Sequence, residues 1–398
     1  MSMMKSSNTE WLGDIPAEWD VAQIGNYYEL RNEKVSDYDF EPLSVTMKGI
    51  VPQLATAAKS DDHSNRKLVK KGDFVINSRS DRRGSCGISP LDGSVSLINI
   101  VMEPRGEMNP QYYNWLFHTE QFADEFYKWG HGIVDDLWTT RWQEMKKILI
   151  VAPSPDEQRA IADYLDKTCS KIDEIIAEAK ASINEYKELK IGQINKYTIH
   201  KMKRTKLKYI TEKIGDGIHA TPEYSDEGTI RFINGGSFGE DSIKMIGPML
   251  SNEEYQKQNK SLLNEHTVMI ALNGANFGNT SLYNNEAILL GKSAGYITLK
   301  STVCREYVRY CLENSVTKEA FDLSLNGTTI PNLSLNTLRN TEICLPDYSV
   351  QKQLAKTIKK MIIKMDSLIA EKESLINDLE AYKKSLIYEV VTGKRRVV

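Results

Sequence analysis

The chain has 398 residues, enough for two or three domains rather than one. Hydrophobic residues make up 40% and charged residues 26%, a composition that excludes a disordered or low-complexity chain. With 51 basic and 54 acidic residues the net charge is −3, which excludes a uniformly cationic nucleic-acid binder but not a local basic face.

Residues 1–152 predict a globular domain of short strands and loops. Short apolar runs alternate with Gly, Asn and Asp turns, a pattern typical of strands joined by loops. Phe74–Ile76 is a strand candidate, and a Gly/Ser-rich loop with several arginines follows it. Apolar residues between Tyr112 and Phe126 then predict a helix.

Residues 153–200 predict one long helix. Their apolar residues alternate spacings of four and three, which is heptad periodicity and gives one apolar seam. The seam residues are Ile161, Leu165, Thr168, Ile172, Ile175, Ala179 and Tyr186. No proline lies in the interior of this segment, and Pro153 and Pro155 mark its start.

Residues 201–346 predict a second globular domain with a strand candidate at Val268–Ile270 and a helix between Tyr307 and Phe321. The two globular stretches match each other much less well than the helices do. We therefore expect two similar frames that hold two different variable surfaces.

Residues 347–398 predict a second long helix that repeats the first. Residues 153–200 align without a gap with 346–393, at an offset of 193 positions. Its seam residues are Leu354, Ile358, Met361, Met365, Leu368, Leu375, Leu379, Tyr382 and Leu386. A period this long is not that of a solenoid, so the chain is expected to be two similar halves in tandem.

A long helix with an uncovered apolar seam would aggregate, so the two helices are predicted to pair with each other. The alternative is that each helix packs on its own globular half. The expected fold class is α+β, with two globular α/β domains and two long helices in a pseudo-twofold tandem repeat.

The five cysteines form no CxxC pair, and their odd number favours reduced thiols over a disulfide framework. The N-terminal stretch lacks the apolar core of a signal peptide, and no run of about eighteen apolar residues could span a bilayer. We expect a cytoplasmic protein without a membrane segment.

No catalytic motif is complete. The sequence at Asn109–Tyr112 departs from the Asn-Pro-Pro-aromatic motif at Gln111, and no GxGxxG loop precedes it. Gly291-Lys-Ser lacks the earlier glycine of a phosphate-binding loop, because Glu286 stands there. The histidines and cysteines have no zinc-ligand spacing. We therefore expect a chain that binds, with no metal and no cofactor of its own.

Four segments together carry a family resemblance: EWLGDIPAEW from Glu10, KKGDFVINSRSDRRGSCGIS from Lys70, PSPDEQRAIADYL from Pro153, and the tail from Gln351 through VVTGKRR. In these segments, and over essentially its whole length, the chain resembles the DNA-specificity subunit of type I restriction–modification systems. The second half departs locally, with Asn264-Glu265 where Gly72-Asp73 stand in the first half.

The resemblance implies target-recognition domains at 1–152 and 201–346, each reading one half of a split sequence in double-stranded DNA. It implies antiparallel spacer helices at 153–200 and 347–398 that fix the distance between the domains. It also implies two modification (methyltransferase) subunits, which bind S-adenosylmethionine and flip an adenine for methylation. Restriction/translocase subunits would use ATP and Mg²⁺, and this chain would be a non-catalytic subunit without a cofactor.

Arg and Lys suit guanine, whereas Asn and Gln suit adenine, so such side chains in loops are the candidate DNA contacts. The candidates are Lys48, Arg66, Asn77, Arg79, Arg82, Arg83 and Ser85 in the first domain, and His219, Thr221, Tyr224, Asn234, Ser237, Asn273, Asn276, Asn326 and Thr328 in the second. Two rival functions remain open: a self-contained methyltransferase or nuclease, and a coiled-coil adaptor or scaffold without DNA readout.

Overall fold

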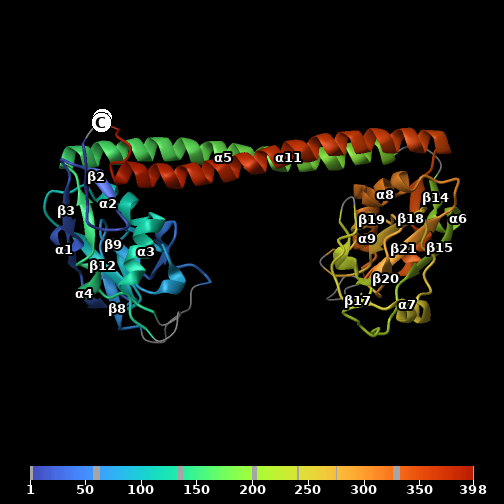
Figure 1. The fold of residues 1–398 in the computed structure, drawn as a ribbon, viewed down its shortest axis with the longest axis horizontal. Helices are drawn as coiled ribbons and strands as arrows, with labels where there is room; N and C mark the ends of the chain where they lie inside the picture. Colours follow the sequence, from blue (N-terminus) through green and yellow to red (C-terminus); the bar gives the residue numbers. More distant parts are fainter. Residues whose placement is uncertain are drawn as a thin grey trace. The chain divides into compact units, whose positions relative to one another are not determined.

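The computed structural model describes residues 3–56, 63–132, 138–199, 204–239, 242–274, 276–325 and 332–397. The chain forms two compact units (Figure 1): unit 1 contains Met1–Ala179 and Ser374–Val398, and unit 2 contains Lys180–Glu373. The boundary between the units therefore crosses both long helices near their middles instead of falling at their ends.

The two long helices are α5 (Pro155–Thr198) and α11 (Tyr348–Val391), of 44 residues each. Helix α5 begins at a proline, whose missing N–H costs nothing at the first helical position. Ser154 and Glu157 form a capping box there, since the Glu157 N–H donates to Ser154 Oγ (3.3 Å) and the Ser154 N–H donates to Glu157 Oε2 (3.2 Å).

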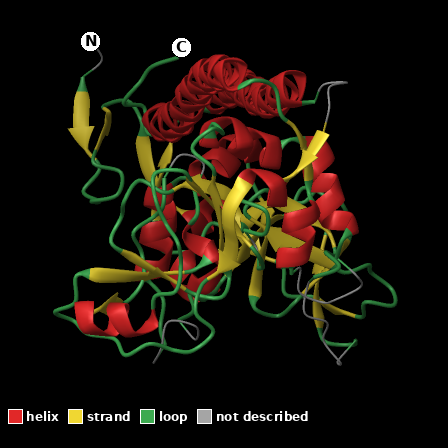
Figure 2. Cartoon of the chain, turned by 90° about the vertical axis from the view of Figure 1, so that its right-hand side faces the viewer, coloured by secondary structure: helices red, strands yellow, loops and turns green. Residues whose placement is uncertain are grey.

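The two helices pack side by side and antiparallel (Figures 1 and 2). In unit 1, Lys383 Nζ lies 2.7 Å from Asp173 Oδ1, and in unit 2, Lys190 Nζ lies 2.9 Å from Asp366 Oδ1. Contacts that move forward along α5 thus move backward along α11. Because the two lysines and the two aspartates are each 193 positions apart, these ion pairs are repeat copies of one another. The predicted pairing is confirmed.

The buried seam differs from the predicted one at every second position. It contains Leu165, Cys169, Ile172, Ile176, Ala179 and Ile183 of α5, with Ile358, Ile362 and Ile376 of α11. Ile161, Leu165, Ile172 and Ile358 are buried as predicted, and Leu354 and Met365 are half-buried. Ile175 was wrongly placed, because its side chain is 45% exposed and the next residue, Ile176, takes the buried position.

The misplaced residues Thr168 and Ile175 of α5 and Met361, Leu368, Leu375 and Tyr382 of α11 lie in a column beside the seam, which Ser182 and Leu189 continue on α5. We call this column the flanking column. From the seam residue Ile172, a step of three residues leads to Ile175 and a step of four leads to Ile176. Both steps occur in a heptad, so the spacing of apolar residues alone could not show which one is buried. The pairing of α5 with α11 therefore leaves a partly exposed column on each helix, which is apolar on α11 and contains the apolar side chains of Ile175 and Leu189 on α5.

Cys169 belongs to the seam and behaves as an apolar residue. Burial raises the pKa of its thiol to about 11, so the thiol stays protonated at neutral pH. All five cysteines are buried and free of disulfide bonds.

In the described residues, the globular part of unit 1 is built around a four-stranded sheet, a three-stranded sheet and a hairpin. The strands of its first sheet are β4 (Tyr28–Leu30), β9 (Phe74–Asn77), β10 (Cys86–Ile88) and β12 (Asn99–Pro104); the others are β5 (Lys34–Val35), β6 (Leu43–Thr46), β7 (Gly49–Pro52), β8 (Arg66–Val69) and β11 (Gly93–Val95). The first sheet is antiparallel in the order β10-β9-β12-β4, the second has the order β11-β8-β5, and β6 pairs with β7.

Unit 2 repeats the first sheet but not the second. The strands are β15 (Thr211–Asp216), β16 (Ile230–Ile233), β17 (Met249–Leu250), β18 (Thr267–Ala271), β19 (Thr280–Leu282), β20 (Ile288–Leu290) and β21 (Ala294–Leu299). The order β19-β18-β21-β15 matches that of unit 1, again antiparallel. In the second sheet, β17-β16-β20, strands β16 and β20 are parallel, whereas all neighbours in the unit 1 sheet are antiparallel.

Helices follow the first sheet in the same order in both units: α2 (Pro110–Phe117), α3 (Glu120–Lys128) and α4 (Trp142–Met145), and α8 (Arg305–Glu313), α9 (Ser315–Leu323) and α10 (Leu335–Asn340). The sequence predicted a single helix where α2 and α3, or α8 and α9, stand. The break is an N-cap in each case, since Thr119 accepts from Phe122 N–H and Asn314 accepts from Thr317 N–H.

The remaining elements of unit 1 are β1 (Met4–Ser6), β2 (Asp14–Pro16), β3 (Asp20–Gln23), α1 (Ile24–Tyr27) and β13 (Leu149–Ala152). Those of unit 2 are β14 (Arg204–Lys206), α6 (Leu207–Ile210), α7 (Asn252–Gln258), which lies between β17 and β18, and β22 (Glu342–Cys344). Strand β13, which directly precedes α5 in the chain, pairs with β3, and strand β22, which directly precedes α11, pairs with β14.

A buried glutamine fastens each long helix to a globular part. Gln158 is 1% exposed; its amide donates to Pro153 O (2.8 Å) and its oxygen accepts from Asn109 N–H, at the start of α2 (2.8 Å). In unit 2, Gln351 donates to Pro346 O (2.7 Å) and accepts from Cys304 N–H, at the start of α8 (2.9 Å). The helices therefore pair with each other and also pack on the globular parts, so both sequence alternatives hold.

We expect Gln158→Leu to lower the free energy of unfolding by about 3 kcal/mol, because a buried N–H and a buried carbonyl each lose their partner. Urea denaturation followed by circular dichroism measures this. Gln353→Leu, an exposed glutamine on α11, is the matched control and is expected to change stability by less than about 0.5 kcal/mol. Equal effects of the two substitutions would show that the fastening contributes nothing.

The ends of the described chain meet in unit 1. Tyr388 Oη donates to Trp11 O (2.8 Å), and Tyr112 Oη donates to Val391 O (2.7 Å). Gly393 has φ +73°, and a Cβ there would lie 2.4 Å from Pro16. Only glycine fits this junction, which explains the glycine of the TGKRR tail.

Candidate DNA-contacting loops

Two hairpin loops of eight residues occupy the same place in the two units. Tip 1 (residues 78–85) joins β9 to β10, and tip 2 (residues 272–279, of which 275 lies outside the described residues) joins β18 to β19. Gly84 and Gly278 have φ of +73° and +77°, the left-handed conformation that favours glycine. Equivalent backbone hydrogen bonds close the loops, from Asn77 N to Ser85 O (2.9 Å) and from Ala271 N to Asn279 O (2.8 Å).

A second loop touches each tip at the same point. Arg79 forms an isolated antiparallel bridge with Thr139, and Asn273 forms one with Asn332. Thr139 and Asn332 are 193 positions apart, the offset of the helix repeat. The repeat therefore extends into the loops, where the sequences no longer show it.

Three predicted DNA contacts in unit 1 are buried. Arg66 is 6% exposed and donates to Ser94 Oγ (2.8 Å) and Ser94 O (3.1 Å), and burial lowers its pKa. Asn77 accepts from Arg79 N–H (3.0 Å), and Ser85 is also buried. These three residues stabilise the fold, which corrects their prediction as base contacts, because a buried side chain cannot reach a groove.

The other predicted residues of unit 1 are accessible. Arg82 and Lys48 are exposed and Arg79 is half-buried. Arg83 is exposed and forms an ion pair with Asp124 of α3. Lys48 lies in the turn between β6 and β7, beside tip 1.

In unit 2 the predicted asparagines are brought together around tip 2. Asn276 Nδ2 donates to Gly236 O (3.0 Å), and Asn234 Oδ1 accepts from Ser293 Oγ (3.0 Å). Asn273 is half-buried at its bridge, and Ser237 is half-buried in the adjoining short helix η3 (Gly235–Ser237). These side chains thus have internal contacts as well as partial exposure.

His219, Thr221 and Tyr224 lie on an exposed segment after β15. His219 Nε2 is 2.8 Å from Asp216 Oδ2, and Tyr224 is 52% exposed. Asn326 and Thr328 lie outside the described residues.

Sequence reasoning missed two side chains near this segment. Lys292 and Asn332 line a hollow of about 260 Å³ together with His219 and Asn273. Lys292 belongs to the Gly-Lys-Ser sequence that fails as a phosphate-binding loop, and nothing else marked it. The ammonium group of Lys292 thus borders the same hollow as the predicted Asn273.

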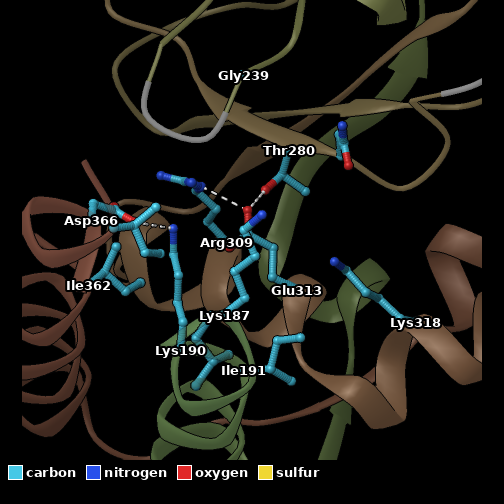
Figure 3. A pocket seen from close by; sticks show the side chains of 13 residues that line it. Lys187, Lys190, Ile191, Gly239, Thr280, Arg309, Glu313, Lys318, Ile362 and Asp366 are labelled. Atoms are coloured by element: carbon cyan, nitrogen blue, oxygen red, sulfur yellow. Dashed lines mark hydrogen bonds and ion pairs between the residues drawn. The ribbon is translucent and has the colours of Figure 1, made fainter. Parts of the chain in front are cut away.

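A larger hollow, of about 400 Å³, lies in unit 2 between the helix pair and the globular part (Figure 3). The Lys190–Asp366 ion pair borders it, and Arg309 Nε donates to Glu313 Oε1 (3.1 Å), which also accepts from Thr280. These contacts tie α8 to β19 next to the helix pair. Within the described ranges, no group of three or more His, Cys, Asp or Glu side chains could hold a metal ion, and no helix is long and apolar enough to cross a membrane.

Comparison with known proteins gives a family match and similar folds. Residues 199–378 match the family model of the type I restriction modification DNA specificity domain. The type I restriction enzyme MjaVIII specificity subunit of Methanocaldococcus jannaschii is 23% identical over 420 residues, covering 96% of this chain and 94% of that protein.

Two solved structures share the fold. A chain from a study of complex assembly and conformational transition in a type I R-M system has a TM-score of 0.78 at 15% identity, covering 96% of this chain and 99% of that one. The HsdS subunit from Thermoanaerobacter tengcongensis has a TM-score of 0.60 at 15% identity, covering 98% of this chain and all of that one. The shared fold includes two α/β domains and paired long helices.

Proposed function

We propose that this chain is a DNA specificity subunit of the type I restriction modification class, and that it reads a bipartite DNA sequence with one globular unit for each half-site. A subunit of this family determines DNA target recognition. The observation that carries the finer proposal is the duplicated frame, in which one sheet order is built twice and combined with two different second sheets. Such an arrangement suits the reading of two unlike half-sites.

The proposed DNA contacts are the accessible members of the predicted set: Lys48, Arg79, Arg82, Arg83, His219, Thr221, Tyr224, Asn234, Ser237, Asn273 and Asn276. Sequence is read through base edges, chiefly in the major groove, whereas phosphate contacts set the register. Because the net charge is −3, partner subunits are expected to supply much of the phosphate contact.

The proposed protein partners are two modification subunits together with restriction/translocase subunits. S-adenosylmethionine, ATP and Mg²⁺ belong to those partners, and this chain positions the target base for a partner that flips it. The flanking column supports the docking of two copies of one partner. Leu189 and Tyr382 share one repeat position and are 50% and 45% exposed, so each unit offers a partly exposed large side chain at an equivalent place; the Tyr382 hydroxyl accepts from Arg395 (3.2 Å) and its ring supplies the apolar surface.

Methylome sequencing tests the function directly. Cells that express the full chain with its modification subunit are expected to carry methylated adenine in a split motif with a fixed gap, and cells without the chain are expected to lose it. Methylation that persists without the chain would instead support a self-contained methyltransferase partner and leave this chain as an adaptor. An unsplit motif would contradict the assignment of one half-site to each unit.

A further inference from the structure

We infer that each unit divides its DNA contacts between two structural parts, an excursion that reads bases and a hairpin tip that holds the phosphate backbone. The excursions are the described residues between the first two strands of each four-stranded sheet: excursion 1 (residues 31–56 and 63–73) and excursion 2 (residues 217–239 and 242–266). This inference rests on the proposed function.

The excursions of the two units contain different elements, whereas the four-stranded sheets from which they extend have the same strand order. Excursion 1 contains β5 to β8, a series of strands with a two-residue turn at Met47-Lys48. Excursion 2 contains β16, η3, β17 and α7, and its strand β16 runs parallel to β20. Two unlike half-sites share the deoxyribose-phosphate backbone and differ only in their bases. Parts whose main-chain fold differs between the units therefore match the bases, and parts whose main-chain fold is shared match the deoxyribose-phosphate backbone.

The tips have different side chains but share their length, a left-handed glycine at the seventh position (Gly84 and Gly278), closing hydrogen bonds and contact with a second loop. Several of their side chains are already engaged inside the protein. Arg83 pairs with Asp124, Asn276 donates to Gly236 O, and Phe277 packs against the core of unit 2. These side chains are poorly placed to discriminate bases, whereas Arg79 and Arg82 suit a phosphate.

Excursion and tip lie next to each other in both units, so one duplex can contact both. A Cβ on Gly87, just after tip 1, would lie 2.9 Å from Gly49 Cα of excursion 1. In unit 2 the Asn276 amide of tip 2 donates to excursion 2. The exposed side chains of the excursions include Lys48, in the turn between β6 and β7 of unit 1, and Thr221 and Tyr224, in the segment after β15 of unit 2.

The test uses the full chain in complex with its modification subunit, and measures methylation of a DNA library that holds every single-base variant of the motif. Lys48→Ala is expected to reduce discrimination about tenfold at a position of the first half-site only. Tyr224→Ala is expected to do so in the second half-site only, and Thr221→Ala is a second variant there in case Tyr224 supports folding.

Arg79→Ala is the contrasting variant in tip 1. It is expected to slow methylation of all library members alike, and to lower the slope of log affinity against log salt by about one. The inference would be overturned if Arg79→Ala changed the recognised bases while Lys48→Ala, Thr221→Ala and Tyr224→Ala left them unchanged. A wild-type complex that methylates no split motif would instead contradict the proposed function, so the two failures can be told apart.

Discussion

Inserting seven residues into both long helices, between Ala179 and Lys180 and between Glu373 and Ser374, is expected to lengthen the gap in the recognised sequence by about three base pairs. One heptad adds about 10 Å of helix and turns its face by only about 20°, so the seam stays in register. At about 3.4 Å per base pair, 10 Å corresponds to about three pairs. Methylome sequencing of cells that carry the lengthened chain measures the gap.

The letters of both half-sites are expected to stay the same, because the insertions leave both globular parts untouched. An insertion into α5 alone is the control. It shifts one half of α5 by seven residues against α11, so the ion pairs Asp173–Lys383 and Lys190–Asp366 cannot both form. This insertion is expected to abolish methylation. New letters with an unchanged gap would show that the helices do not set the spacing.

Leu189→Asp and Tyr382→Asp are each expected to leave one bound modification subunit where the wild-type chain binds two. Both side chains belong to the flanking column and occupy one repeat position, one in unit 2 and one in unit 1. A carboxylate introduced at an apolar interface must be desolvated without a partner, which costs several kcal/mol. Native mass spectrometry of the purified complex counts the bound subunits, and the double variant is expected to bind none.

Lys171→Asp and Lys364→Asp are matched controls, because these exposed lysines also share one repeat position on the same helices. They are expected to keep two modification subunits. Loss of a subunit in these controls would indicate a general effect of charge, and full binding by the double Asp variant would place docking elsewhere on the chain.

The long helices and the strand cores were predictable because their signals are local. The heptads of α5 and α11 contain no internal proline, and the runs at Phe74 and Val268 became β9 and β18. The choice between Ile175 and Ile176 was not predictable, since both are apolar and only the partner helix decides which one is buried. The helix breaks at Thr119 and Asn314 were missed because their N-cap role competes with a continuous apolar pattern.

The candidate contacts were predictable as residue types but not as individual side chains. An arginine in a polar loop suits DNA by its chemistry, yet Arg66 is buried against Ser94 while Lys48 is exposed. Burial depends on strands that are distant in sequence, as β8 and β11 are. Lys292 and Asn332 were missed for the same reason, because only folding brings them to His219.

The sequence by itself determined the duplication, the two long helices and the absence of a complete catalytic motif, since identical residues at a fixed offset and heptad spacing need no tertiary knowledge. Only the tertiary structure decided which apolar column is buried, that the tips are equivalent and that the excursions are not. Those features depend on contacts between segments far apart in the chain, where the amino-acid types on one segment do not specify the partner. The equivalent tips have different side chains, and their common backbone became visible only when the sheets were compared.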